Sequence, residues 1–228
     1  SNDDVHEAIV LAQKAQKEWA KTPIKARSQI LYNFRDLLLR DLIEISEIVA
    51  LENGKTVNEA KAGVMKGIEV LEYALSIQNL DLGGKVEVSR GVFCEYKREA
   101  LGVVCAITPF NFPAMVPMWT IPIALILGNA YIWKPSEKTP LTSRYIADSL
   151  SEAGLPAGLF NVLQGGEDVV DAIVSHKDIK AVSFVGSTKI AKLIYEKSTA
   201  LSKRALCLGG AKNHIILLPD ADLEVSGA

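Results

Sequence analysis

The chain is poor in cysteine and in net charge. Its three cysteines, Cys94, Cys105 and Cys207, are odd in number and lack the paired spacing of metal ligands. Neither a disulfide framework nor a metal site is predicted, and this usage fits a reducing compartment, either the cytoplasm or, in a eukaryote, the mitochondrial matrix. The 25 basic and 27 acidic residues are well mixed, so a net charge of −2 gives no electrostatic reason to expect nucleic acid or a membrane surface as a partner.

Long uninterrupted apolar runs are also missing. The longest apolar stretch, residues 114–132, contains Pro117, Pro122 and Gly128. A buried helix followed by a strand therefore explains it better than a membrane span. The acidic start at residues 1–4 does not fit the basic beginning of a secretory signal peptide. Apolar residues make up 49% of the chain, which is enough to form the core of a folded globular protein.

The first third of the chain has the periodicity of helices. Apolar residues recur every three or four positions in three stretches, which we expect to form helices at residues 4–22, 24–54 and 57–80. Asp4 is expected to cap the first helix, and Gly54 to end the second. Residues 1–82 are thus predicted to be a helical segment that packs on the structure that follows it.

A different pattern begins at residue 83. Polar and apolar residues alternate over residues 86–104 with Arg90-Gly91 available as a turn, and this predicts a β-hairpin that occupies residues 83–102. From residue 103 to residue 228, short apolar runs alternate with helical stretches. Strands are predicted at residues 103–108, 129–134, 159–164, 181–185 and 215–218, and helices at residues 117–127, 140–153, 167–175 and 188–198. This alternation predicts the α/β class, with an open parallel sheet that flanking helices cover on both faces.

Asn111 stands in a turn directly after the first strand of this sheet. Phe110 and Phe112 flank it, and Pro113 keeps the backbone out of a helix at that point. A carboxamide that projects from a rigid turn can donate a hydrogen bond to an oxyanion that develops during a reaction. The alternative is that the Asn111 side chain only bonds the backbone of its own turn, as asparagine commonly does.

A charged segment follows the second strand. Lys134 ends that strand, and Glu137 and Lys138 come soon after it. In open α/β sheets, ligands bind beyond the carboxyl ends of the strands. An ammonium and a carboxylate at this place can hold the two hydroxyls of a ribose, and the Glu137 carboxylate would repel the additional phosphate of NADP. The alternative is a solvated group of charges around a turn.

The segment that contains Gly186 and Ser187 ends another strand and begins a helix. Backbone N–H groups and hydroxyls at a helix start can receive a phosphate. The same Gly-Ser-Thr sequence is also a common helix cap that holds no ligand. Each of the three motifs is ambiguous alone, but as a set they predict a nucleotide-binding cleft.

The strings PFNFP (109–113), WKPSE (133–137) and FVGST (184–188), in this order, resemble those of the aldehyde dehydrogenase superfamily over nearly the whole chain. The resemblance implies a Rossmann-like domain that binds NAD, with Asn111 as the residue that stabilises the oxyanion. It also implies cofactor contacts from Lys134 and Glu137 to the adenosine ribose, from Gly186 and Ser187 near the pyrophosphate, and from Thr108, Phe110 and Lys138 along the cleft.

Within this superfamily, residues 106–117, 134–138 and 210–214 are most similar to the CoA-acylating methylmalonate-semialdehyde dehydrogenases. This similarity implies that the substrate is an acid semialdehyde, that NAD is the oxidant and that CoA is a co-substrate. Most hydrolytic members have a glutamate that activates water where this chain has Cys207, and a thiol cannot serve as the same base. Because Cys207 lies in an apolar, strand-like run, we interpret it as a structural residue rather than a nucleophile.

Lys66 stands where this subgroup has an arginine that holds the substrate carboxylate. Lysine keeps the charge of arginine but loses its bidentate geometry. The resemblance further implies that the hairpin is an oligomerisation extension and that the complete protein is a dimer or tetramer. We also expect the nucleophilic cysteine and the catalytic domain to lie beyond Ala228, so that the chain as given is inactive. The competing interpretations are a hydrolytic aldehyde dehydrogenase of another substrate class and a non-catalytic nucleotide-binding or interaction module.

Overall fold

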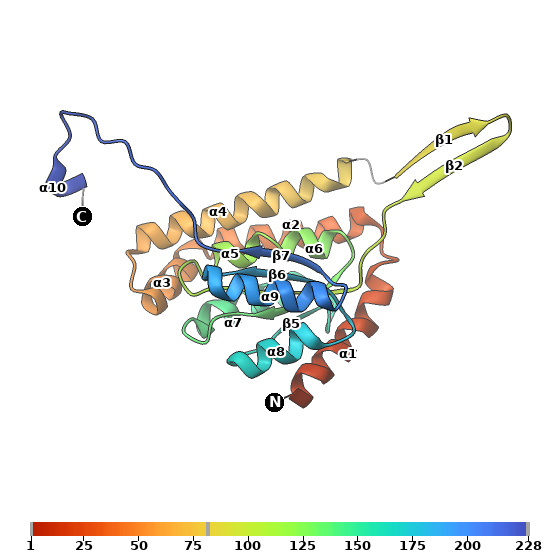
Figure 1. The fold of residues 1–228 in the computed structure, drawn as a ribbon, viewed down its shortest axis with the longest axis horizontal. Coiled ribbons are helices and arrows are strands. Elements are labelled where there is room, and N and C mark those ends of the chain that lie inside the picture. Colours follow the sequence, from red (N-terminus) through yellow and green to blue (C-terminus); the bar gives the residue numbers. More distant parts are fainter. Residues whose placement is uncertain (1, 81–82, 227–228) are drawn as a thin grey trace.

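A five-stranded sheet with the strand order β5-β4-β3-β6-β7 organises the chain (Figure 1). The computed structural model describes residues 2–80 and 83–226. Every pairing within this sheet is parallel. The strands are β3 (Val103–Ile107), β4 (Ala130–Lys134), β5 (Phe160–Val162), β6 (Ile179–Val185) and β7 (Arg204–Leu208). All residues of β3 and β4 are buried, as expected for central strands of a parallel sheet, and the predicted α/β class is confirmed.

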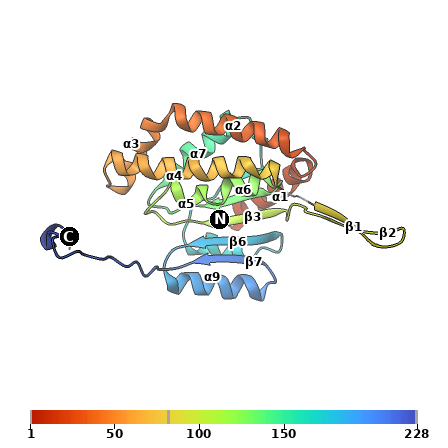
Figure 2. The same ribbon diagram turned by 90° about the horizontal axis from the view of Figure 1, so that it is seen from above.

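Helices cover both faces of the sheet (Figure 2). The helices that connect its strands are α5 (Met115–Met118), α6 (Ile121–Ile126), α7 (Pro140–Glu152), α8 (Glu167–Ser175) and α9 (Thr188–Ala200). Helices α6 and α7 pack on one face together with α2 and α4 of the N-terminal segment, whereas α1, α8 and α9 pack on the other. The single helix predicted at residues 117–127 is wrong, because two short helices form there. Pro122 lies in the first turn of α6, where its missing N–H group costs no hydrogen bond.

The N-terminal segment forms one helix more than predicted. Its α-helices are α1 (Asn2–Trp19), α2 (Ile24–Arg40), α3 (Leu42–Asn53) and α4 (Val57–Ser76), and the 3-10 helix η1 (Ile77–Asn79) follows. The predicted helix over residues 24–54 is interrupted at Asp41, whose carboxylate accepts hydrogen bonds from Arg40. Apolar periodicity continues across this break and therefore hid it. Gly54 ends α3 in the left-handed conformation, as predicted. The predicted cap at Asp4 is wrong, because α1 begins at Asn2 and Asp4 lies in its first turn.

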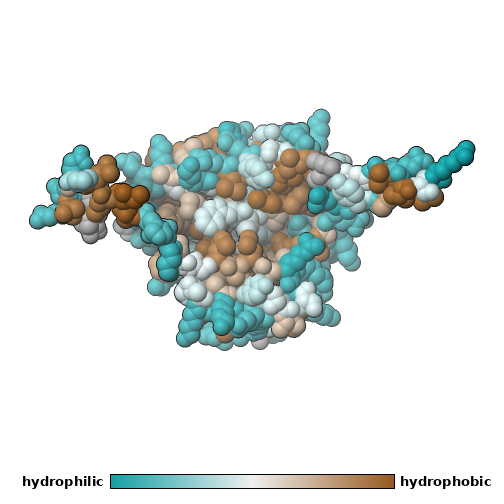
Figure 3. Space-filling view, turned by 45° about the horizontal axis from the view of Figure 1, so that its top comes forward, coloured by the Kyte–Doolittle hydropathy of each residue, from teal (hydrophilic) through white to brown (hydrophobic). Residues whose placement is uncertain are grey.

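The hairpin consists of β1 (Gly83–Ser89) and β2 (Val92–Lys97) and projects from the body of the molecule (Figure 1). The turn at residues 90–91 is confirmed. The hairpin ends at Lys97, earlier than the predicted boundary at residue 102, because residues 98–102 form the connection to β3 and are not part of a strand. Apolar side chains on the hairpin are exposed and give this arm a partly apolar surface (Figure 3). These are Val86, Val88, Val92, Phe93 and Tyr96.

The strand predicted at residues 215–218 is wrong. Its side chains are exposed, and the segment leads along the C-terminal extension to α10 (Leu223–Ser226). The edge of the sheet is formed instead by β7, which pairs with β6 and alternates between exposed and half-buried residues. An apolar run with no adjacent strand cannot form the ladder that its composition favours.

Two histidines join α1 and α8. His6 Nδ1 and His176 Nε2 lie 3.0 Å apart, and the backbone N–H of Asp178 donates to His176 Nδ1. The neutral His176 ring therefore carries its proton on Nε2 and donates it to His6. Partial burial lowers the pKa of His176, although the nearby Asp178 carboxylate opposes the shift. Lys177 and Lys203 are cations near the ring, and they also disfavour its protonation.

We expect acidification to weaken the contact between α1 and α8. The pKa of His176 in the folded state lies below its unfolded value, so its contribution to stability is complete above the unfolded pKa and is lost as the pH falls through the folded pKa. The urea concentration at the midpoint of unfolding should fall as the pH is lowered from about 7 to about 5. In His176→Asn, this midpoint should depend less on pH. His214→Asn is the control, because His214 is exposed on the C-terminal extension. An equally steep dependence in His176→Asn would contradict the assignment.

Candidate functional site

The carboxyl ends of β4, β3 and β6 lie side by side, and the predicted site residues follow these ends. Ile107 at the end of β3 is in register with Lys134 on one side and with Phe184 on the other. The sheet order reverses at β3, since β4 and β5 extend to one side and β6 and β7 to the other. Such a switch point is where open parallel sheets bind their ligands. Three motifs that are distant in the sequence therefore meet at one edge of the sheet.

Thr108 closes the end of β3 against β4. Its backbone N–H donates to Lys134 O at 3.1 Å, and its hydroxyl oxygen accepts a hydrogen bond of 2.8 Å from Trp133 Nε1. Both side chains are buried. Thr108 thus fixes the start of the loop that carries Phe110 and Asn111, and its own hydroxyl proton remains able to bond a ligand.

The Asn111 side chain is exposed, and its amide makes no hydrogen bond to any residue of the segments 2–80 and 83–226. The alternative that this amide bonds its own turn is therefore not what the structure shows. The backbone of the loop is held from outside instead. Lys55 Nζ donates to Asn111 O at 2.7 Å, and Asn53 Nδ2 donates to Phe110 O at 2.8 Å. The loop is anchored through its carbonyls while the amide stays free to donate.

Lys55 also lies 4.0 Å from the centre of the Phe112 ring, so the same ammonium makes a cation–π contact. Partial burial lowers the pKa of Lys55, and the Glu59 carboxylate partly offsets this. Sequence reasoning missed Asn53 and Lys55. The signal available was the polar run that follows α3, but no local pattern indicates which distant loop such a run will contact.

Lys134 and Glu137 form an ion pair at the end of β4. Lys134 Nζ lies 3.2 Å from Glu137 Oε2, and the lysine side chain is 8% exposed whereas the glutamate side chain is 60% exposed. The backbone N–H of Glu137, and next the Lys134 ammonium, hold the pKa of the Glu137 carboxyl below its usual range. Lys138 Nζ lies 4.5 Å from the centre of the Phe110 ring. The buried ammonium can donate a hydrogen bond to a vicinal diol, and the exposed carboxylate beside it can accept one.

Gly186 and Ser187 form the turn from β6 into α9. A Cβ atom on Gly186 would lie 2.6 Å from the Phe184 ring, so the turn accepts only glycine without a shift of that ring. Ser187 is the N-cap of α9, but its hydroxyl makes no capping hydrogen bond. The first-turn N–H groups and this hydroxyl can therefore bind a phosphate. The Gly210 N–H donates to Thr188 Oγ1 at 2.9 Å and ties the segment after β7 to the same turn.

Two further residues have environments that bear on their predicted roles. Lys66 lies on the exposed surface of α4, where its Nζ bonds both carboxylate oxygens of Glu69 at 3.0 and 2.8 Å. Cys207 is half-buried in β7, and burial raises the pKa of its thiol. The Cys207 thiol is therefore neutral near pH 7, which agrees with a structural role rather than a nucleophilic one.

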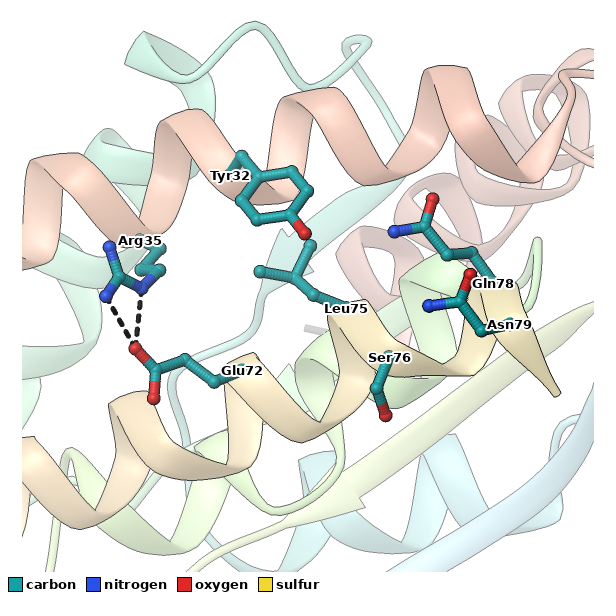
Figure 4. A pocket seen from close by; sticks show the side chains of 7 residues that line it. All are labelled: Tyr32, Arg35, Glu72, Leu75, Ser76, Gln78 and Asn79. Carbon is teal, nitrogen blue, oxygen red and sulfur yellow. Dashed lines mark hydrogen bonds and ion pairs between the residues drawn. The ribbon is translucent and has the colours of Figure 1, made fainter.

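A hollow between α2 and α4 contains none of these motif residues (Figure 4). Its volume is about 360 Å³, and an ion pair crosses one end of it, where Arg35 Nη2 lies 2.6 Å from Glu72 Oε1. Its lining is mainly exposed and polar, and its charged groups already satisfy each other. Within the described ranges, no helix is long and apolar enough to cross a membrane, and no three potential ligand side chains gather as a metal site.

We expect Lys55→Met to loosen the Asn111 loop. The substitution removes both the hydrogen bond to Asn111 O and the cation on the Phe112 ring but keeps an unbranched side chain. Hydrogen exchange measured by mass spectrometry should become about tenfold faster in a peptide that spans residues 108–116, the effect of losing about 1.4 kcal/mol of local stability. Lys61→Met on the exposed side of α4 is the control. Unchanged exchange in Lys55→Met would show that the loop does not depend on this contact.

Comparison with known proteins gives one consistent result. The sequence profile of the Aldehyde dehydrogenase family matches residues 1–227. Malonate-semialdehyde dehydrogenase 2 of Geobacillus thermodenitrificans is 44% identical over 227 residues, which are 99% of this chain and 47% of that protein. The malonate-semialdehyde dehydrogenase of Bacillus pumilus is 43% identical over 224 residues, or 98% of this chain and 46% of that protein. The chain thus spans about half the length of these curated relatives.

Solved structures agree with the sequence comparison. A protein of Sinorhizobium meliloti 1021, assigned as a methylmalonate-semialdehyde dehydrogenase and complexed with NAD, superimposes with a TM-score of 0.94 at 43% identity. The methylmalonate-semialdehyde dehydrogenase of Oceanimonas doudoroffii gives the same two values. Each superposition covers 99% of this chain and 46% of the other chain.

Proposed function

The chain belongs to the aldehyde dehydrogenase family, and we propose that it forms the NAD-binding part of an enzyme that oxidises an acid semialdehyde to an acyl-CoA. One observation carries this proposal most directly. Asn111, the Lys134–Glu137 pair and the Gly186-Ser187 turn follow strands β3, β4 and β6, whose carboxyl ends adjoin at the switch point of the sheet. A relative with the same fold is complexed with NAD, which supports the same cofactor here.

The residues at this edge fit a dinucleotide. The Gly186-Ser187 turn brings backbone close to the ligand, and the start of the 13-residue helix α9 offers N–H groups to the pyrophosphate. Lys134 and Glu137 would hold the ribose hydroxyls of the adenosine. Thr108, Phe110 and Lys138 would line the cleft beside it. NAD, when bound, supplies the hydride acceptor of the reaction.

Asn111 would act on the substrate oxygen. In the proposed reaction a cysteine thiolate from elsewhere in the complete enzyme adds to the aldehyde carbon, and the electron pair of the carbonyl moves onto oxygen. The Asn111 amide donates a hydrogen bond to that oxyanion. The anchoring of the loop by Lys55 and Asn53 keeps the amide in place, so it needs no reorganisation when the charge develops.

Cys207 supports release of the acyl group to CoA rather than to water. A neutral thiol cannot remove a proton from water, and burial raises the pKa of Cys207 further. The thiol of CoA is a far better nucleophile than water and needs less assistance. The names of the similar proteins indicate malonate or methylmalonate semialdehyde as the substrate class. Lys66 is the proposed partner of the substrate carboxylate, and it would have to leave Glu69 to serve that role.

The hairpin is the proposed oligomerisation element of the complete protein. Its five large apolar side chains are exposed on a two-stranded arm, and such an arm gains stability when another surface covers it. We propose a homo-oligomer, either a dimer or a tetramer.

Glu137→Gln tests the nucleotide assignment in the chain itself. Tryptophan fluorescence followed during titration should show saturable NAD binding, because Trp133 bonds Thr108 next to the proposed cleft. The substitution removes the charge that repels the additional phosphate of NADP, so the preference for NAD over NADP should fall by about tenfold. Glu7→Gln on the exposed side of α1 is the control. The absence of saturable NAD binding to a correctly folded chain would show that these residues do not suffice as a cofactor site.

The complete enzyme tests the reaction. NADH formation from malonate semialdehyde should require CoA for full rate, and Asn111→Ala should lower kcat by about a hundredfold, because one oxyanion donor is lost. The control variant is Asn213→Ala, on the exposed extension after β7. Full turnover without CoA would overturn the acylating proposal in favour of hydrolysis. An unchanged kcat in Asn111→Ala would remove Asn111 from the mechanism.

A further inference from the structure

A second polar pocket lies at the opposite end of the sheet from the nucleotide edge. Its volume is about 430 Å³, and it lies among the α1–α2 turn, the end of β2 and the residues that precede β3 and β4. Ala100 and Leu127, which line it, stand before the amino ends of those strands, whereas the motif residues follow their carboxyl ends. This pocket is therefore separate from the edge of the sheet that carries the motif residues.

Four cationic side chains and one carboxylate line this pocket. The cations are Lys21, Arg27, Lys97 and Arg98, and the carboxylate is Glu99. Lys21 is already paired with Glu18 at 2.9 Å on the exposed surface. Lys97 and Arg98 at the end of β2 are exposed and have no salt-bridge partner among residues 2–80 and 83–226. The pocket thus has an excess of positive charge.

Arg27 is the unusual member of this group. It is only 8% exposed, and its one hydrogen bond within the described chain runs from Nη1 to Trp19 O at 3.2 Å. Its buried Nε has no partner there, and no carboxylate lies within ion-pair distance of the guanidinium. Removing a cation from water without a counter-charge is costly. An anion in the pocket would supply the missing counter-charge.

Two other buried cations, Lys134 and Lys203, have either a carboxylate or two carbonyl groups as partners. Lys134 pairs with the Glu137 carboxylate. Lys203 donates to the carbonyls of Val174 and His176 at the C-terminal end of α8, where the helix dipole favours a cation. Arg27, in contrast, bonds only one carbonyl, that of Trp19, and no carboxylate among the residues that the structure describes.

The guanidinium of Arg27 lies against Gly128, in the turn that precedes β4. Gly128 has a φ of 89°, which favours glycine, and a Cβ atom there would lie 2.7 Å from Arg27 Nη1, so a larger residue would displace the end of the Arg27 side chain. Two side chains of α1 fix the same turn, since Gln16 Nε2 donates to Gly128 O at 3.1 Å and Trp19 Nε1 donates to Leu125 O at 2.8 Å. Such preorganisation lowers the cost of binding a ligand.

We propose that this pocket is an anion site that binds a small molecule with a phosphate or carboxylate group. Arg27 forms its floor, and the exposed cationic side chains of Lys97 and Arg98 bind the ligand from the base of the hairpin. Arginine is suited to this role because its planar donor set matches the oxygens of phosphate and carboxylate. The volume exceeds that of a single ion and fits a diphosphate or a short dicarboxylate.

Calorimetric titration at fixed ionic strength tests the site, with inorganic pyrophosphate and malonate as separate probes. We expect saturable binding with a Kd below about 1 mM for at least one probe, and the tighter probe identifies the phosphate or the carboxylate class. Arg98→Ser should weaken binding by about tenfold, because it removes an exposed cation and leaves the fold intact. Arg27→Met should weaken it further, and the urea midpoint of this variant will show whether it still folds.

Arg90→Ser is the matched control, since it makes the same charge change at the exposed hairpin turn, away from the pocket. No saturable binding of either probe would overturn the proposal. Binding that Arg98→Ser leaves unchanged would place the anion elsewhere, including at the start of α9, and would overturn it as well. An equal loss in Arg90→Ser would show a general effect of charge and would also count against the site. These outcomes do not depend on the fluorescence titration with NAD, because the anion titration uses other ligands and other variants.

Discussion

The position of β3 between β4 and β6 is the constraint on which the rest of the structure depends. Ile107 must stand opposite both Lys134 and Phe184 for the three loops that follow these strands to meet. A slip of one residue would turn the side chains of β3 to the opposite faces, and all five of its residues are buried. The Trp133–Thr108 hydrogen bond reinforces this register at the end where the candidate site begins.

The N-terminal helices do more than cover this sheet. The turn between α3 and α4 provides Asn53 and Lys55 to the loop of Asn111, while Glu52 accepts hydrogen bonds from the backbone N–H groups of Leu141 and Thr142 at 2.5 and 2.9 Å. A carboxylate at the start of α7 also interacts favourably with its helix dipole. The end of α3 and the turn after it therefore fix both the loop of Asn111 and the helix that follows Glu137. This places the helical segment within the architecture of the site.

How far the sequence predicted this structure depended on whether the signal was local. Buried strands such as β4 and the helix α8 have clear patterns and were located within one residue. Apolar periodicity continues through Asp41 and hides the break in the helix there. The apolar composition of residues 215–218 favours a strand, but composition cannot show whether a neighbouring strand exists to pair with it. The motifs could be placed at one edge of the sheet because each follows a strand, and the carboxyl ends of parallel strands lie at the same edge.

Contacts between segments that are distant in the sequence could not be predicted from local patterns. Nothing near Lys55 in the sequence indicates Asn111, and nothing near Arg27 indicates that a carboxylate is missing from its surroundings. Both facts depend on tertiary packing, because Lys55 contacts a loop 56 residues away in the sequence and the end of Arg27 lies against Gly128. Unusual pairing of buried polar groups is visible only in three dimensions.

The proposed nucleotide site and the proposed anion site lie at opposite ends of β4. Gly128 precedes this strand and contacts Arg27, and Lys134 ends it and contacts Glu137. Coupling between two sites requires an element with two arrangements that each ligand favours differently. β4 is buried along its whole length and hydrogen-bonded to a strand on each side, so a second arrangement would have to break these hydrogen bonds and disturb the packing of its side chains. We therefore expect occupation of one proposed site to leave the affinity of the other proposed site unchanged.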